Sequence, residues 1–181
     1  MIKMICVNGY PCSGKTTFED YCIDFLGKEW GKKISTIDVI KEICKDLGWD
    51  GVKTPESRRF LSEMKDLLSR APWGDIPLMS IEDYCESLES WLSLFDQKEV
   101  RTFYVFVDAR EPKNIEILKK KHNAITVFIQ RPLDLADLSN HADKEVENYN
   151  YDYYINNSGS LADLKKVAKD FIILLKESEN E

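Results

Sequence analysis

The apolar positions of the chain fall into short unbroken runs that alternate with longer segments of helical periodicity. The runs at 2–7, 102–108 and 124–129 predict strands buried on both faces, and 33–37 and 153–155 predict two shorter strands. Between these runs, apolar residues recur three or four positions apart, which predicts helices. Strands that alternate with helices predict an α/β fold, in which helices cover both faces of a central parallel sheet of about five strands.

Two helices between the second and third strands are placed by their expected caps. Thr54 precedes Pro55 as the N-cap of one helix, and Ser80 with Asp83 resembles a capping box that opens the other. Segment 71–79 holds two prolines and a glycine, so we expect a connecting loop there. The buried faces of the two helices are expected to consist of Phe60, Leu61, Met64, Leu67 and Leu68, and of Tyr84, Leu88, Trp91, Leu92 and Phe95.

The stretch between the first strand and the first helix carries the best defined chemistry. Residues 9–16 read GYPCSGKT and fill every position of the phosphate-binding pattern G-x-x-x-x-G-K-[ST]. Glycines let the backbone curl so that successive N–H groups point at a phosphate, and the following helix adds the positive end of its dipole. Lys15 is expected to reach the β- and γ-phosphates, and Thr16 to place its hydroxyl on Mg²⁺.

The alternative interpretation of this stretch is a Gly- and Ser-rich turn. Strand, glycine loop and helix follow one another in the order that phosphate binding requires, which favours the phosphate loop. The nucleotide-binding candidates in and after the loop are therefore Gly9, Cys12, Ser13, Gly14, Lys15, Thr16 and Thr17.

Two aspartates are candidates for the metal site and the chemistry. Asp108 ends a long apolar run, which places it, like Gly9 and Asp38, at the carboxyl end of a strand. There Asp108 would hold Mg²⁺ directly or through water, as a Walker-B acid does, unless it is simply solvated. Asp38 could join the metal shell, act as a base or contact the substrate, and it could equally be the N-cap of the next helix.

The arginines indicate what accepts the phosphate. Arg58, Arg59, Arg110 and Arg131 lie in segments expected to face the ligand cleft, and arginine suits bidentate phosphate recognition. An acceptor that already carries a phosphate would use such a set and would need no general base, whereas a hydroxyl acceptor would rely on Asp38. Each arginine taken alone could also be an ordinary surface residue.

The C-terminal part of the chain resembles a known family. Residues 106–112, FVDAREP, with Glu116 on the next helix, resemble the D-x-R segment of deoxynucleoside monophosphate kinases of the phage type. The segments 131–132, 140–143 and 151–161 are similar to the lid and tail of those enzymes, and animal-type phosphomevalonate kinase is similar over the same segments.

The middle of the chain resembles a different group. Residues 48–51 and 58–61 are similar to a bacterial adenylate-kinase-like subgroup. Taken together, the resemblances imply a three-layer P-loop kinase fold with a short lid at about 131–150 and ATP as the phosphate donor. They also imply that Arg58 or Arg59, with Arg110, faces the acceptor phosphate and that Arg131 contacts the nucleotide from the lid.

The lid sequence departs from the family pattern. Adenylate-kinase lids bring several arginines over the phosphates, whereas here Arg131 and Lys144 are outnumbered by the acids Asp134, Asp137, Asp143, Glu145 and Glu147. This composition argues against tight closure and fast turnover. His141 could contact a phosphate or be a solvated loop histidine.

Composition narrows the setting in which these motifs act. A chain of 181 residues fits one domain, and its net charge of −7 argues against nucleic acid as the main partner. No apolar run approaches the roughly 20 residues of a membrane span, and the first strand starts almost at Met1. We therefore expect a cytoplasmic monomer or homodimer with a small-molecule substrate and no membrane partner.

The cysteines and histidines exclude other kinds of site. Five cysteines without a C-x-x-C pair are typical of reduced thiols, and two histidines form no cluster for a transition metal. Cys6, Cys22, Cys44 and Cys85 are expected in the core. Cys12 lies inside the phosphate loop, where it could be either an ordinary loop thiol or a thiol of lowered pKa with a redox role.

These observations favour one function and leave two others open. The favoured hypothesis is an ATP- and Mg²⁺-dependent phosphotransferase that moves the γ-phosphate to a small phosphorylated acceptor, a nucleoside or deoxynucleoside monophosphate above all. Lys15, Asp108, Arg110 and Arg131 would form its catalytic centre. The alternatives are a kinase for another phosphorylated metabolite, such as phosphomevalonate, and a nucleotide-binding regulatory protein that transfers no phosphate.

Overall fold

The computed structural model describes residues 1–95, 101–132, 146 and 149–178. The chain divides into two compact units. The sheet unit comprises Met1–Lys33 and Arg101–Glu181, and the helical unit comprises Ile34–Val100. Each unit is described by itself, and the expected single domain over residues 1–181 stays a prediction.

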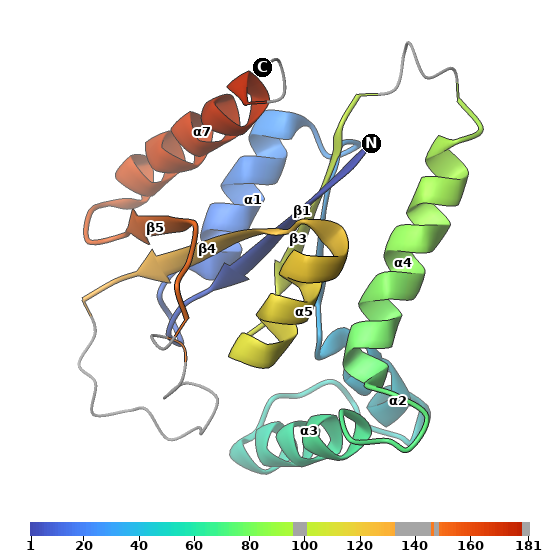
Figure 1. The fold of residues 1–181 in the computed structure, drawn as a ribbon. Coiled ribbons are helices and arrows are strands. Elements are labelled where there is room, and N and C mark those ends of the chain that lie inside the picture. The colour runs from blue at the N-terminus through green and yellow to red at the C-terminus, as the bar shows by residue number, and fades with distance from the viewer. Residues whose placement is uncertain (96–100, 133–145, 147–148, 179–181) are drawn as a thin grey trace. The chain divides into compact units, whose positions relative to one another are not determined.

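The strands form one five-stranded sheet in the order β2-β3-β1-β4-β5 (Figure 1). The pairings of β1 with β3, of β1 with β4 and of β4 with β5 are parallel. This confirms the predicted α/β class and its parallel sheet. The strands are β1 (Ile2–Asn8), β2 (Gly31–Ser35), β3 (Phe103–Asp108), β4 (Ile125–Gln130) and β5 (Tyr153–Asn156).

One strand starts earlier than the apolar pattern predicted. β2 covers Gly31–Ser35 rather than 33–37, and the backbone N–H of Tyr104 already donates to the carbonyl of Trp30. Residues 36–37 form the turn that leads into the next helix. The strand was predicted too late in the sequence because residues 34 and 37 are apolar. Ile37, however, belongs to the helical unit and packs near Ile40 there.

Strand register brings three strand ends to one edge of the sheet. Val7 pairs with Asp108 across β1 and β3, and Asn8 pairs with Phe128 across β1 and β4. The strands are parallel, so the carboxyl ends of β1, β3 and β4 lie together. This edge is where ligands bind in open α/β sheets.

Helices cover both faces of the sheet, as the sequence predicted. α1 (Lys15–Leu26) and α7 (Leu161–Glu177) lie side by side on one face, and α5 (Pro112–His122) lies on the other (Figure 1). Phe18 and Cys22 of α1 and Phe171 of α7 pack against Ile5 and Phe106 of the strands. The predicted capping box of α7 is also present, because Ser160 and Asp163 exchange hydrogen bonds at its start.

The helical unit contains α2 (Asp38–Asp46), α3 (Pro55–Leu68) and α4 (Ile76–Leu92). Ile40, Cys44 and Leu61 form its buried centre, with Trp49 and Met64 packed against them. Thr54 caps α3 as predicted: its side chain accepts from the Ser57 N–H, and the Ser57 hydroxyl accepts from the Thr54 N–H.

The structure corrects the predicted start of α4. We expected 71–79 to be a loop and Ser80 with Asp83 to open the helix, but α4 begins at Ile76 and Ser80 lies inside it. Asp75 is the N-cap and accepts from the Leu78 N–H at 3.1 Å. Pro77 is tolerated because the first-turn N–H that it lacks has no helical partner. Proline was therefore a mark of a helix start rather than of a loop.

Four residues expected in the buried helix faces are exposed: Phe60, Leu67, Trp91 and Phe95. Besides Pro77 in the first turn, the buried positions of α4 are Leu78, Ile81, Cys85 and Leu92, spaced as one side of a helix. Phe95 lies beyond the end of α4, and its ring packs on that of Trp91 with centroids 4.7 Å apart. The positions of apolar residues in the sequence therefore predicted wider buried faces for α3 and α4 than the structure shows.

Candidate phosphate-binding site

The loop between β1 and α1 has the backbone conformation of a phosphate cradle. Gly9 and Gly14 have φ values of +146° and +96°, and Cys12 has a φ of +60°. Side chains rarely adopt such angles, which explains glycine at the two defined positions. A Cβ on Gly9 would overlap the Ile129 carbonyl oxygen, and one on Gly14 would overlap Asn157 Nδ2. The loop thus packs directly against β4 and the segment after β5.

Two asparagines fix this loop from outside. Asn8 Oδ1 accepts from the Gly9 N–H at 2.8 Å, while its Nδ2 donates to the Tyr151 hydroxyl at 2.8 Å and to the Arg110 carbonyl at 3.1 Å. Asn157 Nδ2 donates to the Ser13 carbonyl at 2.8 Å. Both asparagines are buried, and our sequence analysis gave neither a role. The sequence feature that could have identified them is a polar residue at the end of a strand or directly after it.

Lys15 is held inside the loop. Its Nζ donates to the carbonyls of Gly9 and Tyr10, both at 2.8 Å, and the residue is only 8% exposed. A buried ammonium group needs such partners, because it would otherwise carry a large desolvation cost. The ammonium group is therefore held within the loop, and its contact with the β- and γ-phosphates stays a prediction.

The first turn of α1 supplies further polar groups. α1 begins at Lys15, so the N–H groups of Lys15, Thr16 and Thr17 have no partner within the helix and carry the positive end of its dipole. Thr16 is exposed and Thr17 is half-buried. The Ser13 hydroxyl oxygen is buried and has no hydrogen-bond partner within the described residues. These groups are the donors that a phosphate oxygen would accept from.

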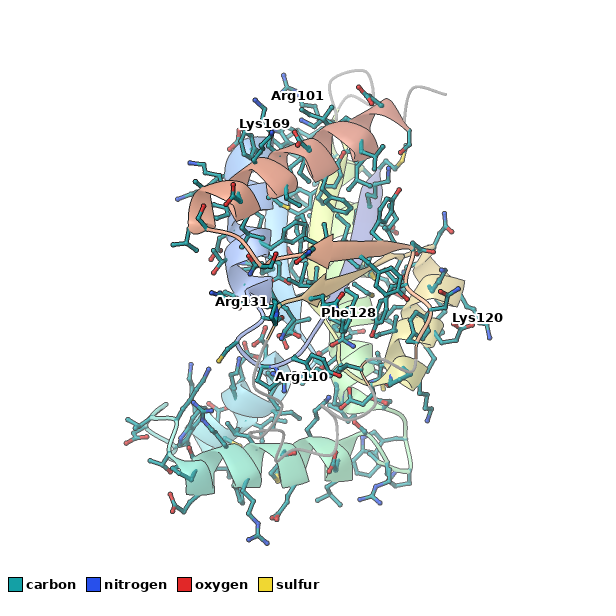
Figure 2. The ribbon with its side chains drawn as sticks, turned by 90° about the vertical axis from the view of Figure 1, so that its left-hand side faces the viewer. Arg101, Arg110, Lys120, Phe128, Arg131 and Lys169 are labelled. Carbon is teal, nitrogen blue, oxygen red and sulfur yellow. The ribbon has the colours of Figure 1, made fainter. Side chains whose placement is uncertain are left out.

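The sheet unit brings the phosphate loop together with three other candidates. Asp108 ends β3 in register with Val7, and Arg110 follows it by two residues. Arg131 follows the end of β4, and Figure 2 shows both arginines at the edge where these strands end. Asp108 and Arg110 are half-buried, and Arg131 is exposed. Of the expected lid at about 131–150, only 131–132, 146 and 149–150 are described, and His141 lies outside the described residues.

The other candidates belong to the helical unit. The N-cap of α2 is Ile37, so Asp38 is the first helical residue and not the cap. Asp38 Oδ2 accepts from the Ser35 N–H at 2.8 Å, and Asp38 Oδ1 pairs with Lys41 at 2.7 Å. Arg58 and Arg59 are both exposed on α3. The position of these three residues against the phosphate loop stays a prediction.

A buried acid that the sequence analysis missed lies beside Lys15. Glu19 is one helical turn further along α1 and only 4% exposed. Burial above all, and the nearby charge of Asp108, raise the pKa of its carboxyl group to about 8, although Lys33 and Lys15 oppose the shift. A glutamate on the core side of an amphipathic helix was the available signal.

The cysteines are distributed as predicted. Cys6, Cys22, Cys44 and Cys85 are buried, Cys12 is exposed, and all five are free thiols. Burial raises the pKa of Cys6 to about 12 and that of Cys85 to about 11. Cys12 is therefore the thiol that a reagent in solution would reach first.

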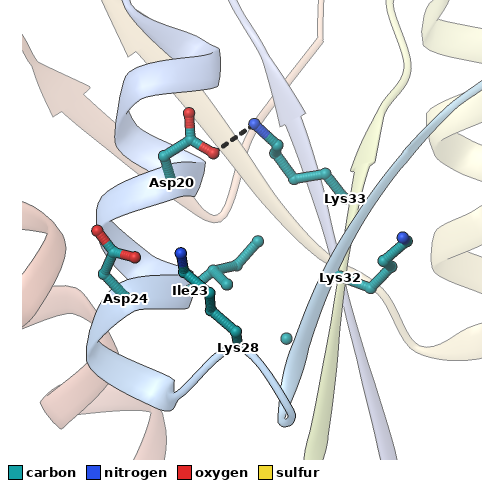
Figure 3. Close-up of a pocket in the computed structure, with 7 residues that line it drawn as sticks. Asp20, Ile23, Asp24, Lys28, Lys32 and Lys33 are labelled. Atoms are coloured by element: carbon teal, nitrogen blue, oxygen red, sulfur yellow. Dashed lines mark hydrogen bonds and ion pairs between the residues drawn. The ribbon is translucent and has the colours of Figure 1, made fainter.

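A hollow of about 480 Å³ lies on the sheet unit between α1 and the start of β2 (Figure 3). Three lysines and two aspartates line it, and Lys33 pairs with Asp20 at 2.5 Å. The hollow contains none of the predicted site residues. Because its charges are mixed and partly paired, it gives no preference for an anion, and the phosphate loop remains the candidate site.

The protein offers no complete metal site of its own in the part that the structure describes. No group of three or more His, Cys, Asp or Glu side chains is gathered there. Within the described residues, no helix is both long and apolar enough to cross a bilayer.

Comparison with known proteins identifies the fold. No family model matches the chain, and no curated protein matches it in sequence. A sugar kinase from Janibacter sp. HTCC2649 is similar in structure, with a TM-score of 0.50 and 13% identity over 93% of this chain and 92% of that one. With the five-stranded parallel sheet and its helices, this likeness shows that the chain shares the α/β fold of that structure.

Two more solved structures are similar at a lower score. Shikimate kinase from Aquifex aeolicus vf5 has a TM-score of 0.48 and 15% identity over 98% of this chain and 97% of that one. The Mycobacterium tuberculosis APS kinase in complex with AMPPNP and APS has a TM-score of 0.48 and 16% identity over 96% of this chain and 97% of that one.

Proposed function

We propose that the protein is an ATP- and Mg²⁺-dependent phosphotransferase that acts on a small phosphorylated acceptor, specifically a nucleoside or deoxynucleoside monophosphate. The observation that carries this proposal is the formed phosphate loop, with Lys15 fixed on two loop carbonyls at the N-terminus of α1. Phosphoryl transfer consists mainly of positioning and charge neutralisation, and this loop is suited to both.

The metal would be held by Thr16 and Asp108 together with the nucleotide. Thr16 presents an exposed hydroxyl in the first turn of α1, and Asp108 presents a carboxylate at the end of the neighbouring strand. Magnesium bound there would neutralise charge on the β- and γ-phosphates. Arg110 and Arg131 follow the same sheet edge, where they can bind phosphate oxygens as the transferred group leaves the donor.

The choice of a phosphorylated acceptor rests on Asp38 and the arginines. A hydroxyl acceptor would need a base, but both oxygens of Asp38 are engaged, one by Lys41 and one by the Ser35 N–H. A phosphate acceptor needs cations instead, and Arg58, Arg59 and Arg110 are the available set. The resemblance of residues 106–112 to deoxynucleoside monophosphate kinases points to the same acceptor.

A coupled assay for ADP formation tests the proposal. Purified protein with ATP and Mg²⁺ is given each common nucleoside and deoxynucleoside monophosphate in turn, and then phosphomevalonate, shikimate and simple sugars. We expect ADP formation with at least one monophosphate and none with the unphosphorylated acceptors. If phosphomevalonate alone is turned over, the proposed acceptor is wrong but the proposed reaction, phosphoryl transfer to a phosphorylated acceptor, is supported. Turnover with a sugar or shikimate alone would overturn the acceptor assignment.

A regulatory protein that binds nucleotide without transferring phosphate is the second candidate, and the acidic sequence at 131–150 favours it. Alkylation of Cys12 can report nucleotide binding independently of turnover, because Cys12 is the exposed cysteine and lies in the phosphate loop. It can therefore distinguish the kinase from the regulatory protein. Bound nucleotide should slow alkylation of Cys12 about tenfold at a ligand concentration ten times the Kd. Protection of Cys12 without turnover of any acceptor would favour the regulatory protein over the kinase.

A further inference from the structure

We propose that Glu19 is a second carboxylate ligand, beside Asp108, for the divalent cation that accompanies the nucleotide phosphates. This inference rests on the proposed function, because the cation would reach the site with the nucleotide. It adds a ligand that the phosphate-loop pattern does not contain, since the pattern ends at Thr16.

The position of Glu19 fits this role. It lies one helical turn after Lys15 and three residues after Thr16, and residues at these spacings share one side of a helix. That side of α1 faces the sheet, because Phe18 and Cys22 pack there against Val7 and Phe106. Val7 is the register partner of Asp108. Glu19 therefore faces the strand pair that carries Asp108.

The carboxyl group of Glu19 needs a partner. Its Oε1 is buried and has no hydrogen-bond partner within the described residues, which is costly for a polar atom. The charged or titratable groups near it are Lys15, Asp20 and Cys22 on α1, Lys33 on β2 and Asp108 on β3. Both lysines have their own acceptors, since Lys15 donates to two loop carbonyls and Lys33 pairs with Asp20.

A divalent cation is the partner whose chemistry fits. Asp108 lies near enough for its charge to raise the pKa of Glu19, and two neighbouring carboxylates repel each other. A cation between them turns that repulsion into attraction and supplies the missing bond to Glu19. Magnesium and manganese take one or two carboxylates together with phosphate oxygens. Because the described residues hold no group of three acids, binding would require the nucleotide.

The test measures how much the metal adds to nucleotide binding. The Kd of AMPPNP is determined by calorimetry in EDTA and again with saturating Mn²⁺, for wild type, Glu19→Gln and Glu19→Met. The ratio of the two Kd values isolates the contribution of the metal. We expect both substitutions to lower that ratio at least ~10-fold, as the loss of a metal-site group does, and to leave the Kd in EDTA unchanged or lower.

Several controls separate this result from a structural effect. Asp24→Asn removes an exposed acid from the same helix and should leave the ratio unchanged. Gln and Met are neutral side chains of similar length, one polar and one apolar, so a loss common to both reports on the carboxylate. The electron paramagnetic resonance spectrum of bound Mn²⁺ should change in both variants and not in Asp24→Asn.

The outcomes for Glu19 and for the proposed function can be told apart. An unchanged ratio in Glu19→Gln and Glu19→Met would overturn the role of Glu19 while wild-type binding of Mn²⁺·AMPPNP still supported the proposed function. A wild type that binds AMPPNP neither with nor without Mn²⁺ would overturn both. If Glu19→Gln loses its fold in circular dichroism, Glu19→Met decides, because it leaves no unpaired polar atom in the core.

Discussion

Lys15 and Arg59 are both cations that the proposed reaction would bring to a phosphate, yet the protein holds them in opposite ways. Lys15 is 8% exposed, and two backbone carbonyls fix its ammonium group. The Arg59 side chain is 82% exposed and pairs with Glu63 one turn along α3 at 2.8 Å. In the proposed reaction, the donor side would therefore be preformed by the backbone, whereas the acceptor side would depend on long side chains that must be ordered when the substrate binds.

Single substitutions at these two cations should therefore differ in their effect on activity. Removing a cation that the loop holds in place should abolish all of its stabilisation of the phosphate charge, because no other group can take its position. An exposed arginine contributes less, since water and a neighbouring carboxylate already compete for it. The donor side should therefore respond more strongly than the acceptor side.

The largest effect is expected for Lys15→Ala. It removes the cation that neutralises the β- and γ-phosphates, so kcat/KM should fall by about 10³-fold or more, in the range found for single charge-stabilising groups. The coupled ADP assay and AMPPNP calorimetry measure it. Lys165→Ala, an exposed lysine of α7, is the control. If Lys15→Ala kept near wild-type turnover, the conclusion that the preformed donor side responds more strongly than the acceptor side would be wrong.

Gly14→Ala tests whether the loop itself is preformed. Its φ of +96° strains any side chain, and the new Cβ would displace Asn157 from the Ser13 carbonyl. We expect a loss of roughly 2–3 kcal/mol in unfolding free energy and weaker AMPPNP binding. Gly48→Ala is the matched control, because its φ is +101° but nothing lies within 4 Å of the added Cβ. It should cost only about 1 kcal/mol.

Equal losses in the two glycine variants, measured by urea unfolding, would mean that backbone strain alone decides and that Asn157 does not hold the loop. A larger loss in Gly14→Ala that Asn157→Ala reproduces would show that the contact across the sheet matters.

On the acceptor side, Arg58→Ala and Arg59→Ala test which arginine meets the substrate. Arg59 is paired with Glu63, and no ion pair of Arg58 occurs with another described residue. We expect Arg58→Ala to raise the KM of the acceptor about tenfold and Arg59→Ala to raise it less, with the KM of ATP unchanged in both. A larger effect of Arg59→Ala would reverse the assignment, and no effect of either would remove α3 from the acceptor site.

The sequence predicted the parts of this fold that local chemistry decides. Buried runs such as 103–107 became central strands because a strand covered on both faces needs apolar residues at every position. The phosphate loop was predictable because its conformation depends on its own glycines. Thr54 and Ser160 were predictable because each caps a helix through hydrogen bonds that span three residues.

The parts that the sequence did not predict depend on contacts between distant residues. Asn157 supports the loop through a hydrogen bond to Ser13, 144 positions away, and Asn8 meets Tyr151 across 143 positions. Glu19 is unusual only because the sheet buries it. The exposure of Trp91 depends on which side of α4 the other helices cover. No local pattern carries this information.

The smallest effect is expected where a cation and a carboxylate serve stability alone. Lys119 pairs with Asp152 at 2.6 Å, and Asp152 Oδ2 also accepts from the N–H and hydroxyl of Thr126 at the start of β4. This cluster lies where β4 and β5 begin, and none of its three side chains belongs to the proposed site. Asp152→Asn should lower the free energy of unfolding by about 1 kcal/mol, since the pair is partly exposed to solvent, and should leave kcat/KM unchanged.

The pH dependence of this loss identifies its cause. Burial tends to raise the pKa of Asp152, but the hydrogen bonds from Lys119 and Thr126 outweigh it and lower the pKa below the ordinary value of 3.8. A carboxyl group with a lowered pKa stabilises the fold above pH 3.8, and that stability is lost as the pH falls through its value in the folded protein. The difference between wild type and Asp152→Asn should therefore shrink as urea unfolding is repeated at lower pH. If the difference in unfolding free energy stayed constant down to acidic pH, the loss would be due to packing and not to the charge of Asp152. If Asp152→Asn also lowered kcat/KM, the effects of this residue on stability and on the phosphate loop would not be separable.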